Sequence, residues 1–226
     1  MKGLLYKDLT LIVGSYRMNF VFLLVVYTAM AFALQMDFIA YALVFVVGLY
    51  ASTTISMDEN SRWDLYARTL PVTPGQIVAG KFLLTLGCTA VGAALSFLLL
   101  AVMPHNPPLP EAAAGLAAAV TTTLVYGALV IPLSYKFGAA KARSWVMGVL
   151  FALFFLPLLA LSSLPEETRD ALWGALGLRG DSQPDALSLT EGQGLWLFLA
   201  AMLATSLLAV GISWAVSVPL YRQKTD

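Results

Sequence analysis

The residues best equipped for chemistry or recognition lie in a polar stretch, 56–76, between two long apolar stretches. Within it, Trp63 and Tyr66 are three residues apart, so on a helix they would share one face. Charged residues of both signs surround this aromatic pair. The side chains that we select as candidate contacts for another protein are Asp58, Glu59, Arg62, Trp63, Tyr66 and Arg68.

A short helix is predicted over 57–70. Ser56 and Glu59 have the spacing of a capping box, in which each side chain binds the other residue's free backbone N–H. Pro71 would end this helix, because proline cannot continue the hydrogen-bonding pattern. The sequence Thr-Pro-Gly-Gln at 73–76 then provides a second cap and a first-turn proline, so the next long helix should begin there.

Two interpretations of this polar segment remain open. It is either a docking site for a soluble partner protein or a helix lying on lipid, with its aromatic side chains as headgroup anchors. The mixed charge favours docking, because helices on a lipid surface usually carry a more uniformly basic polar face.

Elsewhere the sequence shows no constellation typical of an active site. Residues 75–81 match the spacing of a phosphate-binding loop up to Lys81, but Phe82 replaces the Ser or Thr that holds magnesium and no strand precedes the match. Cys88 has no partner base within its apolar stretch, and His105 is a lone histidine in a short loop. We therefore expect no catalytic residue, metal site or cofactor site in this chain, and an intramembrane enzyme is the least favoured class.

The elements that must position the polar segment are membrane helices. Of 226 residues, 59% are hydrophobic and only 12% are charged, whereas a soluble domain carries roughly 25% charged residues. The mean hydropathy is +0.80. This composition excludes a soluble globular domain, a disordered chain and a nucleic-acid-binding protein, and the single cysteine excludes a disulfide framework.

A helix that crosses the hydrocarbon core needs about 20 mostly apolar residues. Six stretches satisfy this, which predicts an all-α polytopic membrane protein with six transmembrane helices. Small residues four apart, such as Gly48 with Ser52 and Gly115 with Ala119, should let the helices pack closely. Although Ala-Phe-Ala at 31–33 resembles a signal-peptide cleavage site, we expect the first span to be retained. The predicted spans are 18–34, 38–55, 77–103, 112–135, 145–161 and 195–220.

The distribution of basic residues predicts the orientation in the plasma membrane. With the N-terminus inside, every one of the 13 Lys and Arg residues except Arg169 and Arg179 lies on the cytoplasmic side, where loops rich in Lys and Arg remain. Both termini are therefore expected in the cytoplasm. The segments outside the spans are a weakly amphipathic interfacial helix at 1–17, an external segment at 162–194 and a cytoplasmic tail at 221–226.

Three short segments carry a resemblance to a known family. They read SMDEN at 56–60, LPVTP at 70–74 and IVAGK at 77–81, and they follow an amphipathic N-terminus and two spans. Together they resemble the permeases of the type-2 ABC exporter superfamily, the ABC-2 membrane proteins. More narrowly, the chain looks like the small six-helix permeases that pair with a separate ATPase, including those that export phenol-soluble modulins and similar amphipathic peptides.

The resemblance implies a coupling helix at about 57–70 that fits a cleft in a cytoplasmic ABC ATPase subunit. It also implies two permease copies, identical or closely related, and two ATPase subunits that bind Mg-ATP. The expected function is export of an amphipathic or hydrophobic cargo, such as a peptide or a drug, by alternating access.

Hydroxyl groups within the spans are candidates for a substrate path, although they can equally satisfy backbone groups or face neighbouring helices. The alternative function is an ion-coupled transporter or channel. Such proteins usually need buried carboxylates or broken helices at mid-membrane, and the predicted spans contain no Asp or Glu well inside. The candidate path residues are Ser96, Thr121, Thr122 and Thr123.

Overall fold

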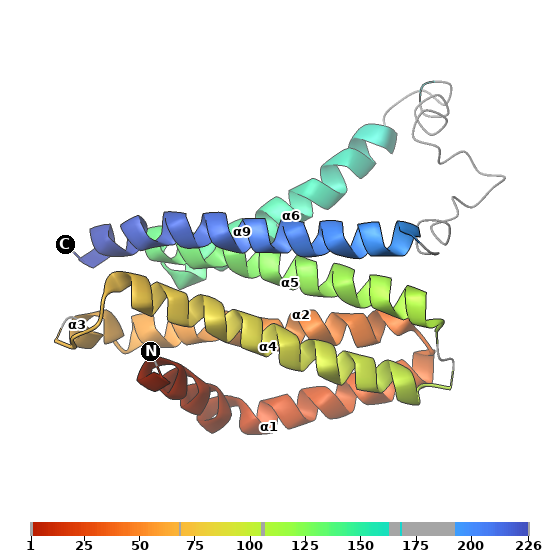
Figure 1. The fold of residues 1–226 in the computed structure, drawn as a ribbon, viewed down its shortest axis with the longest axis horizontal. Helices are drawn as coiled ribbons and strands as arrows, with labels where there is room; N and C mark the ends of the chain where they lie inside the picture. Colours follow the sequence, from red (N-terminus) through yellow and green to blue (C-terminus); the bar gives the residue numbers. More distant parts are fainter. Residues whose placement is uncertain (1, 68, 105–106, 163–167, 169–192, 226) are drawn as a thin grey trace.

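The computed structural model describes residues 2–67, 69–104, 107–162, 168 and 193–225, and the regular structure in these ranges is helical. The long helices run side by side along one axis of the molecule (Figure 1). In chain order the helices are α1 (Lys2–Leu34), α2 (Asp37–Asn60), α3 (Trp63–Ala67), α4 (Pro74–Val102), α5 (Leu109–Phe137), α6 (Ala139–Ser162) and α9 (Gln193–Thr225).

The prediction of an all-α polytopic membrane protein is confirmed. Among the described residues, α1, α2, α4, α5 and α9 are long and apolar enough to cross a membrane. The span predicted at 145–161 lies within α6, several of whose side chains fall outside the description. The external segment predicted at 162–194 also lies outside the described residues, apart from its ends and residue 168.

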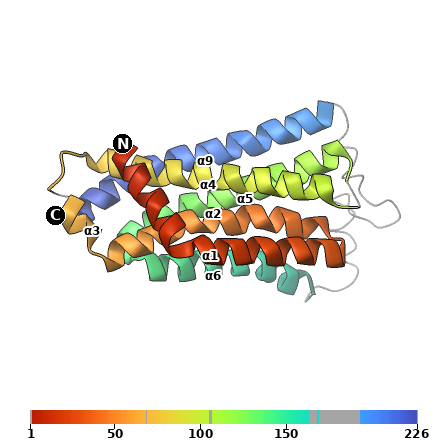
Figure 2. The same cartoon turned by 90° about the horizontal axis from the view of Figure 1, so that it is seen from below.

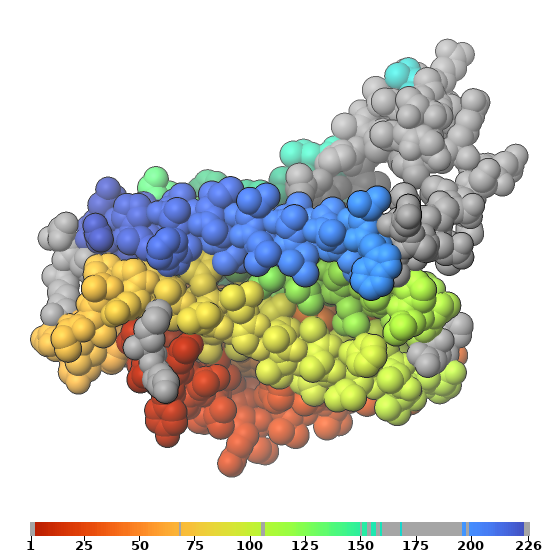
Figure 3. Space-filling model, in the orientation of Figure 1, coloured from red at the N-terminus to blue at the C-terminus, as the bar shows by residue number. Residues whose placement is uncertain are grey.

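Helix α2 is the most buried of the candidate spans and packs against α1, α4 and α5. Helix α9 packs along α5 and α4 (Figure 3). Glycine allows α2 and α5 to approach closely at two points, as the spacing of small residues predicted. A methyl group added to Gly48 would overlap Thr123 of α5, and one added to Gly115 would overlap the ring of Tyr41. The N-terminal part of α6 packs on α5, whereas its C-terminal part leans away from the bundle (Figure 1).

The N-terminal segment differs from the prediction of a separate helix at 1–17. Residues Lys2–Leu34 form one continuous helix. Figures 1 and 2 show that this helix bends, so that its first turns cross the bundle obliquely while the rest runs beside α2. The amphipathic segment thus continues into the first span without a break in the helix.

The predicted helix over 57–70 begins too early and ends too late. Ser56 lies inside α2, which continues to Asn60, so the predicted capping box of Ser56 with Glu59 does not form. The chain then turns at Arg62, which has a φ of 51°, and α3 occupies only five residues. Asp58 and Glu59 have partners on other helices, described below, and these contacts favour the extension of α2.

The second predicted cap is confirmed. The backbone N–H of Gln76 donates to Thr73 Oγ1 at 3.3 Å, and the backbone N–H of Thr73 donates to Gln76 Oε1 at 3.2 Å. Pro74 occupies the first position of α4. This capping box sets where α4 begins and therefore where Lys81 lies, two turns into the helix.

Candidate functional site

Helix α3 lies at the end of the bundle that also carries both chain termini (Figures 1 and 2); we call this the α3 end. In Figure 3 the orange-yellow atoms of the connection between α2 and α4 lie at the left end of the molecule. Ala67 is 3% exposed and packs in a cluster with Tyr135 of α5 and Tyr221 of α9. In contrast, Leu65 and Tyr66 are 57% and 58% exposed. Helix α3 therefore has a fixed inner face and a free outer face.

Behind α3 lies a ring of four charged side chains: Lys7 and Asp8 of α1, Asp58 of α2 and Lys81 of α4. Lys81 Nζ is 2.9 Å from Asp8 Oδ2 and 2.6 Å from Asp58 Oδ2. Lys7 Nζ is 3.0 Å from Asp8 Oδ1 and 2.6 Å from Asp58 Oδ1. We call this arrangement the ion-pair ring; its charges alternate and sum to zero.

Burial makes the alternation of charge in the ring important. The side chains of Asp8 and Lys81 are only 4% and 6% exposed. Removing such charges from water costs several kcal/mol per ion, and good geometry with opposite charges must offset that cost. Each carboxylate here faces two ammonium groups, and Lys81 also donates to Thr54 Oγ1 at 3.1 Å. The ring consequently ties α1, α2 and α4 together in one arrangement.

Besides the packing of Ala67, polar and aromatic contacts connect α3 to the rest of the bundle. Lys7 Nζ lies 4.1 Å from the centroid of the Trp63 ring, so this ammonium takes part in the ion-pair ring and in a cation–π contact at once. On the other side, the Tyr221 hydroxyl donates to Asp64 Oδ1 at 3.2 Å. Helix α3 is thereby held by α1 through Trp63 and by α9 through Asp64.

Glu59 links the end of α2 to the start of α6. Its Oε2 accepts a hydrogen bond of 2.7 Å from the backbone N–H of Ala139, the first residue of α6. The preceding residue, Gly138, has a φ of 87°. A Cβ at this position would lie 2.8 Å from Glu59 Oε1, so the glycine leaves room for the carboxylate. A carboxylate at a helix N-terminus is favourable because it complements the helix dipole.

Five of the six predicted contact residues are described, and they separate into two groups. The assignment of Asp58 as a partner contact is corrected, because Asp58 is 7% exposed and its carboxylate is bound within the ion-pair ring. Glu59 uses its carboxylate to cap α6, and Trp63 is partly buried against Lys7. Arg62 and Tyr66 are exposed on the outer side. Arg68 lies outside the described residues.

The four candidate path residues do not share one surface. Ser96 and Thr123 are buried within the bundle, whereas Thr122 faces outward and donates to the Ala118 carbonyl of its own helix. Thr121 donates to the carbonyl oxygen of Met202 in α9 at 3.2 Å. Thr123 also donates to a carbonyl of its own helix, that of Ala119, and the buried Ser96 hydroxyl has no hydrogen-bond partner among the described residues.

Sequence reasoning missed most of the ion-pair ring. Lys81 was noted for its match to a phosphate-binding loop, but residues 74–81 form the first turns of α4 and Lys81 pairs with carboxylates instead. Two features of the sequence could have indicated this pairing: Asp8 is acidic within a basic N-terminal segment, and Lys81 is a lysine within a predicted span. Within the described ranges, no group of three His, Cys, Asp or Glu side chains could hold a metal ion.

Comparison with known proteins agrees with this architecture. Residues 3–222 match a protein-family model described as an ABC-2 family transporter protein. No curated protein and no solved structure matches the chain significantly. A membrane subunit of this family works in transport, together with an ABC ATPase subunit. Since the match extends over nearly the whole chain and the described helices include five suited to cross a membrane, the chain belongs to the ABC-2 family of transporter proteins, as a multi-pass permease subunit.

Proposed function

We propose that this permease forms the membrane part of an ATP-driven exporter and that its ATPase docks on the outer face of α3. The two-sided character of α3 carries the proposal: Leu65 and Tyr66 are more than half exposed, whereas Ala67 is buried. Tyr and Arg are among the side chains that contribute most to protein interfaces, and exposed Arg62 lies just before α3. Because the inner face of α3 is already packed, the backbone of this segment loses little freedom on binding.

The contacts behind α3 support mechanical coupling between the ATPase and the membrane helices. A movement of α3 would displace Trp63 against Lys7, and through the ion-pair ring it would act on α1, α2 and α4. The same movement would act on α9 through the bond of Asp64 with Tyr221. In the proposed mechanism, Mg-ATP bound by the partner subunits brings them together, and α3 moves with them. The α3 end, with both termini, then faces the cytoplasm.

The proposed cargo is amphipathic or hydrophobic, such as a peptide or a drug. The support is the apolar character of the described membrane helices, which offers little to bind a hydrophilic solute. An amphipathic peptide should therefore stimulate ATP hydrolysis by the assembled complex, and a hydrophilic peptide of equal length should not.

Replacing Tyr66 with alanine should weaken the complex with the ATPase about 30-fold, because a central aromatic contact contributes about 2 kcal/mol to an interface. The measurement is the fraction of tagged permease that retains ATPase over a range of ATPase concentrations. Stimulation of ATP hydrolysis by the amphipathic peptide should be lost in parallel.

Phe38→Ala is the matched control for Tyr66→Ala. Phe38 is 75% exposed and lies at the start of α2, far along the bundle from α3 (Figure 1). An unchanged affinity in Tyr66→Ala would contradict docking on α3, and so would an equal loss in both variants. Loss of peptide stimulation alone, with ATPase binding intact, would instead place Tyr66 in transmission rather than docking.

The second permease copy is proposed to pack against α6. Helix α6 leans away from the bundle, and a groove of about 300 Å³ between α5 and α6 is lined by apolar side chains that include Leu133, Trp145 and Val149. Trp145 and Val149 are 63% and 55% exposed. A second copy that enters this groove would bury both and would enclose a pathway between the two subunits.

Cysteine cross-linking tests this interface. In a Cys88→Ser background, single cysteines placed along the exposed side of α6, at positions such as 145 and 149, should give disulfide-linked dimers under mild oxidation. Cysteines at Phe22 and Val25 of α1, which are 67% and 61% exposed, should remain monomeric. Dimers that form only through α1 would show that the second copy binds elsewhere.

A further inference from the structure

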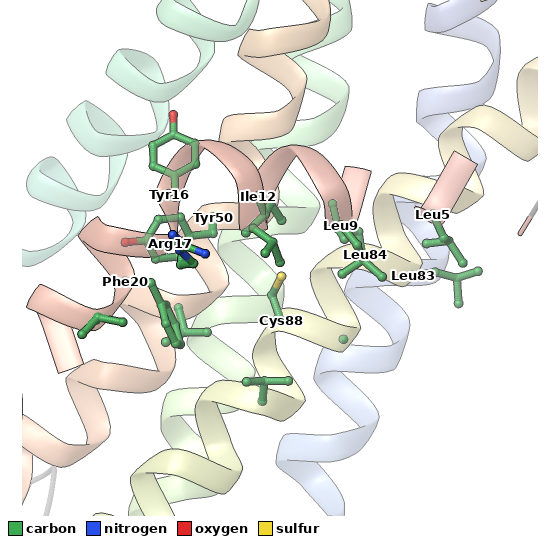
Figure 4. Close-up of a pocket in the computed structure, with 15 residues that line it drawn as sticks. Leu5, Leu9, Ile12, Tyr16, Arg17, Phe20, Tyr50, Leu83, Leu84 and Cys88 are labelled. Carbon is green, nitrogen blue, oxygen red and sulfur yellow. The ribbon is translucent and has the colours of Figure 1, made fainter. Parts of the chain in front are cut away.

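An apolar recess lies beneath the bent N-terminal part of α1, between α1, α2 and α4 (Figure 4). Its volume is about 450 Å³, which falls within the roughly 300–1,000 Å³ of small-molecule sites. Val47, Tyr50 and Leu84 form a buried floor. Leu9 and Val91 on its rim are 50% and 53% exposed, so the recess opens to the outside of the bundle.

One end of the recess carries a cation. Arg17 is the charged residue of its lining, and Figure 4 shows it beside Tyr16 and Tyr50, at the opposite end from Leu5. Arg17 is exposed, and in the part of the chain that the structure describes, no ion pair or hydrogen bond involves its guanidinium group. The apolar pocket therefore ends at a charged group that is available to an anion.

The position of Arg17 along α1 places it near the membrane surface. The helix from 18 to 34 would rise about 25 Å, close to the roughly 30 Å of a hydrocarbon core. Arg17 precedes this apolar stretch directly. It should consequently lie at the boundary between hydrocarbon and headgroups, where lipid phosphates are found and basic side chains are attracted to them.

We propose that the recess binds a membrane phospholipid, with an acyl chain against the apolar floor and the phosphate on Arg17. A phospholipid is the molecule at this depth that combines a long apolar chain with an anionic group next to it. A transported peptide or a second copy of this chain could also fill the apolar part, but a phospholipid is present at this depth at high concentration throughout the membrane.

A bound lipid would support the same segment that contributes to the ion-pair ring. The N-terminal part of α1 forms one wall of the recess and also carries Lys7 and Asp8. The lipid fills the space between this segment and α4, to which Lys81 of the ring belongs. The identity of the headgroup would thus influence how firmly the N-terminal segment is held.

Gly87 offers a way to fill the recess without distorting the helices. Gly87 lines the recess, and a Cβ added to it would meet no atom within 4 Å. In Gly87→Leu the new side chain should occupy the space of the acyl chain. Gly211→Leu is the matched control, because Gly211 lies in membrane helix α9, outside the recess, and its added Cβ also meets nothing within 4 Å.

Native mass spectrometry of the full-length permease, purified in mild detergent, measures lipid retention. The probes are phosphatidylglycerol and a diacylglycerol with the same chains. We expect the natural chain and Gly211→Leu to retain phosphatidylglycerol at least tenfold better than diacylglycerol. Gly87→Leu should lose most of both lipids. Arg17→Gln should lose the preference for phosphatidylglycerol, whereas Arg62→Gln, which removes an exposed arginine outside the recess, should keep it.

Three results would overturn the proposal. The first is equal retention by Gly87→Leu and Gly211→Leu, and the second is an unchanged lipid preference in Arg17→Gln. The third is a fall in the mass of the assembly from two chains to one in Gly87→Leu, which would show that a second copy fills the recess.

A cross-linking experiment on the natural chain keeps the test independent of any folding defect in Gly87→Leu. A phosphatidylglycerol with a photoactivatable group at mid-chain should label the α4 side chains that line the recess, which are Leu83, Leu84, Cys88 and Val91. Labelling spread evenly over α4 and α9 would show only general contact with lipid and would contradict a specific site.

Discussion

Replacing Lys81 with methionine should lower the free energy of unfolding of the permease by about 3–5 kcal/mol, because it leaves buried carboxylates without a partner. Lys81 Nζ lies within 2.9 Å of Asp8 Oδ2 and 2.6 Å of Asp58 Oδ2. In Lys81→Met the two carboxylates would share only Lys7, and each would lose one of its two opposite charges. Methionine keeps the length of the side chain, so the loss reports on charge rather than on packing.

Thermal unfolding in detergent, compared with Lys141→Met, measures this effect. Lys141 is exposed near the start of α6, so its replacement should change the Tm very little. The double variant Lys81→Met with Asp58→Leu should recover more than half of the loss, because it removes one charge of each sign and leaves the 3.0 Å pair of Lys7 with Asp8. Equal Tm values for the two single lysine variants would show that the ring contributes no stability.

The fold was predictable because the membrane imposes it. A span must satisfy its own backbone hydrogen bonds and must be long and apolar, so composition along the chain identifies helices. The predicted spans at 38–55 and 112–135 fall within α2 and α5 for this reason. Local capping was predictable too, since the hydrogen bonds of Thr73 and Gln76 involve only neighbours in sequence.

The loop was predicted less well because distant residues determine its conformation. Ser56 and Glu59 have the correct spacing for a local cap, which could stabilise a helix by about 1 kcal/mol. Extending α2 instead brings Asp58 to Lys7 and Lys81 and brings Glu59 to the start of α6. These contacts span 51 and 80 residues of sequence for Lys7 and Ala139, respectively, so no local pattern reveals them.

The same limit explains why the site was only partly predicted. Exposed Tyr66 was identified from its aromatic type and its polar surroundings, which are properties of the segment itself. Lys7 and Asp8 were not selected, because their role depends on the bend of α1 that carries them over α2 and α4 (Figure 2). A charged residue in an amphipathic flank is usually solvated, and only its neighbours in space distinguish it.

Replacing Gly138, which connects α5 and α6, with alanine should lower the free energy of unfolding of the permease by about 3–5 kcal/mol, for two separate reasons. Gly138 has a φ of 87° and a ψ of 153°, a region that is essentially restricted to glycine and costs other residues about 1–3 kcal/mol. In addition, the new Cβ would lie 2.8 Å from Glu59 Oε1 and would push the carboxylate away from the Ala139 N–H. Loss of that charged hydrogen bond costs about 1.5–3 kcal/mol.

A double-mutant cycle separates the two causes. In a Glu59→Ala background the carboxylate is absent, so Gly138→Ala should cost only its backbone strain. The loss of stability in the double variant should therefore be smaller than the sum of the losses in the two single variants. Gly148→Ala is the control, because Gly148 lies within α6, its added Cβ meets nothing within 4 Å, and its replacement should slightly stabilise the helix. If Gly138→Ala costs the same with and without Glu59, backbone strain alone sets its effect, and the link from α2 to α6 through Glu59 contributes nothing. The expected coupling would instead show that α2 holds α6 through Glu59. Since the adjacent Asp58 pairs with Lys7 of α1 and Lys81 of α4, two neighbouring carboxylates at the α3 end of α2 would then connect it to three other helices.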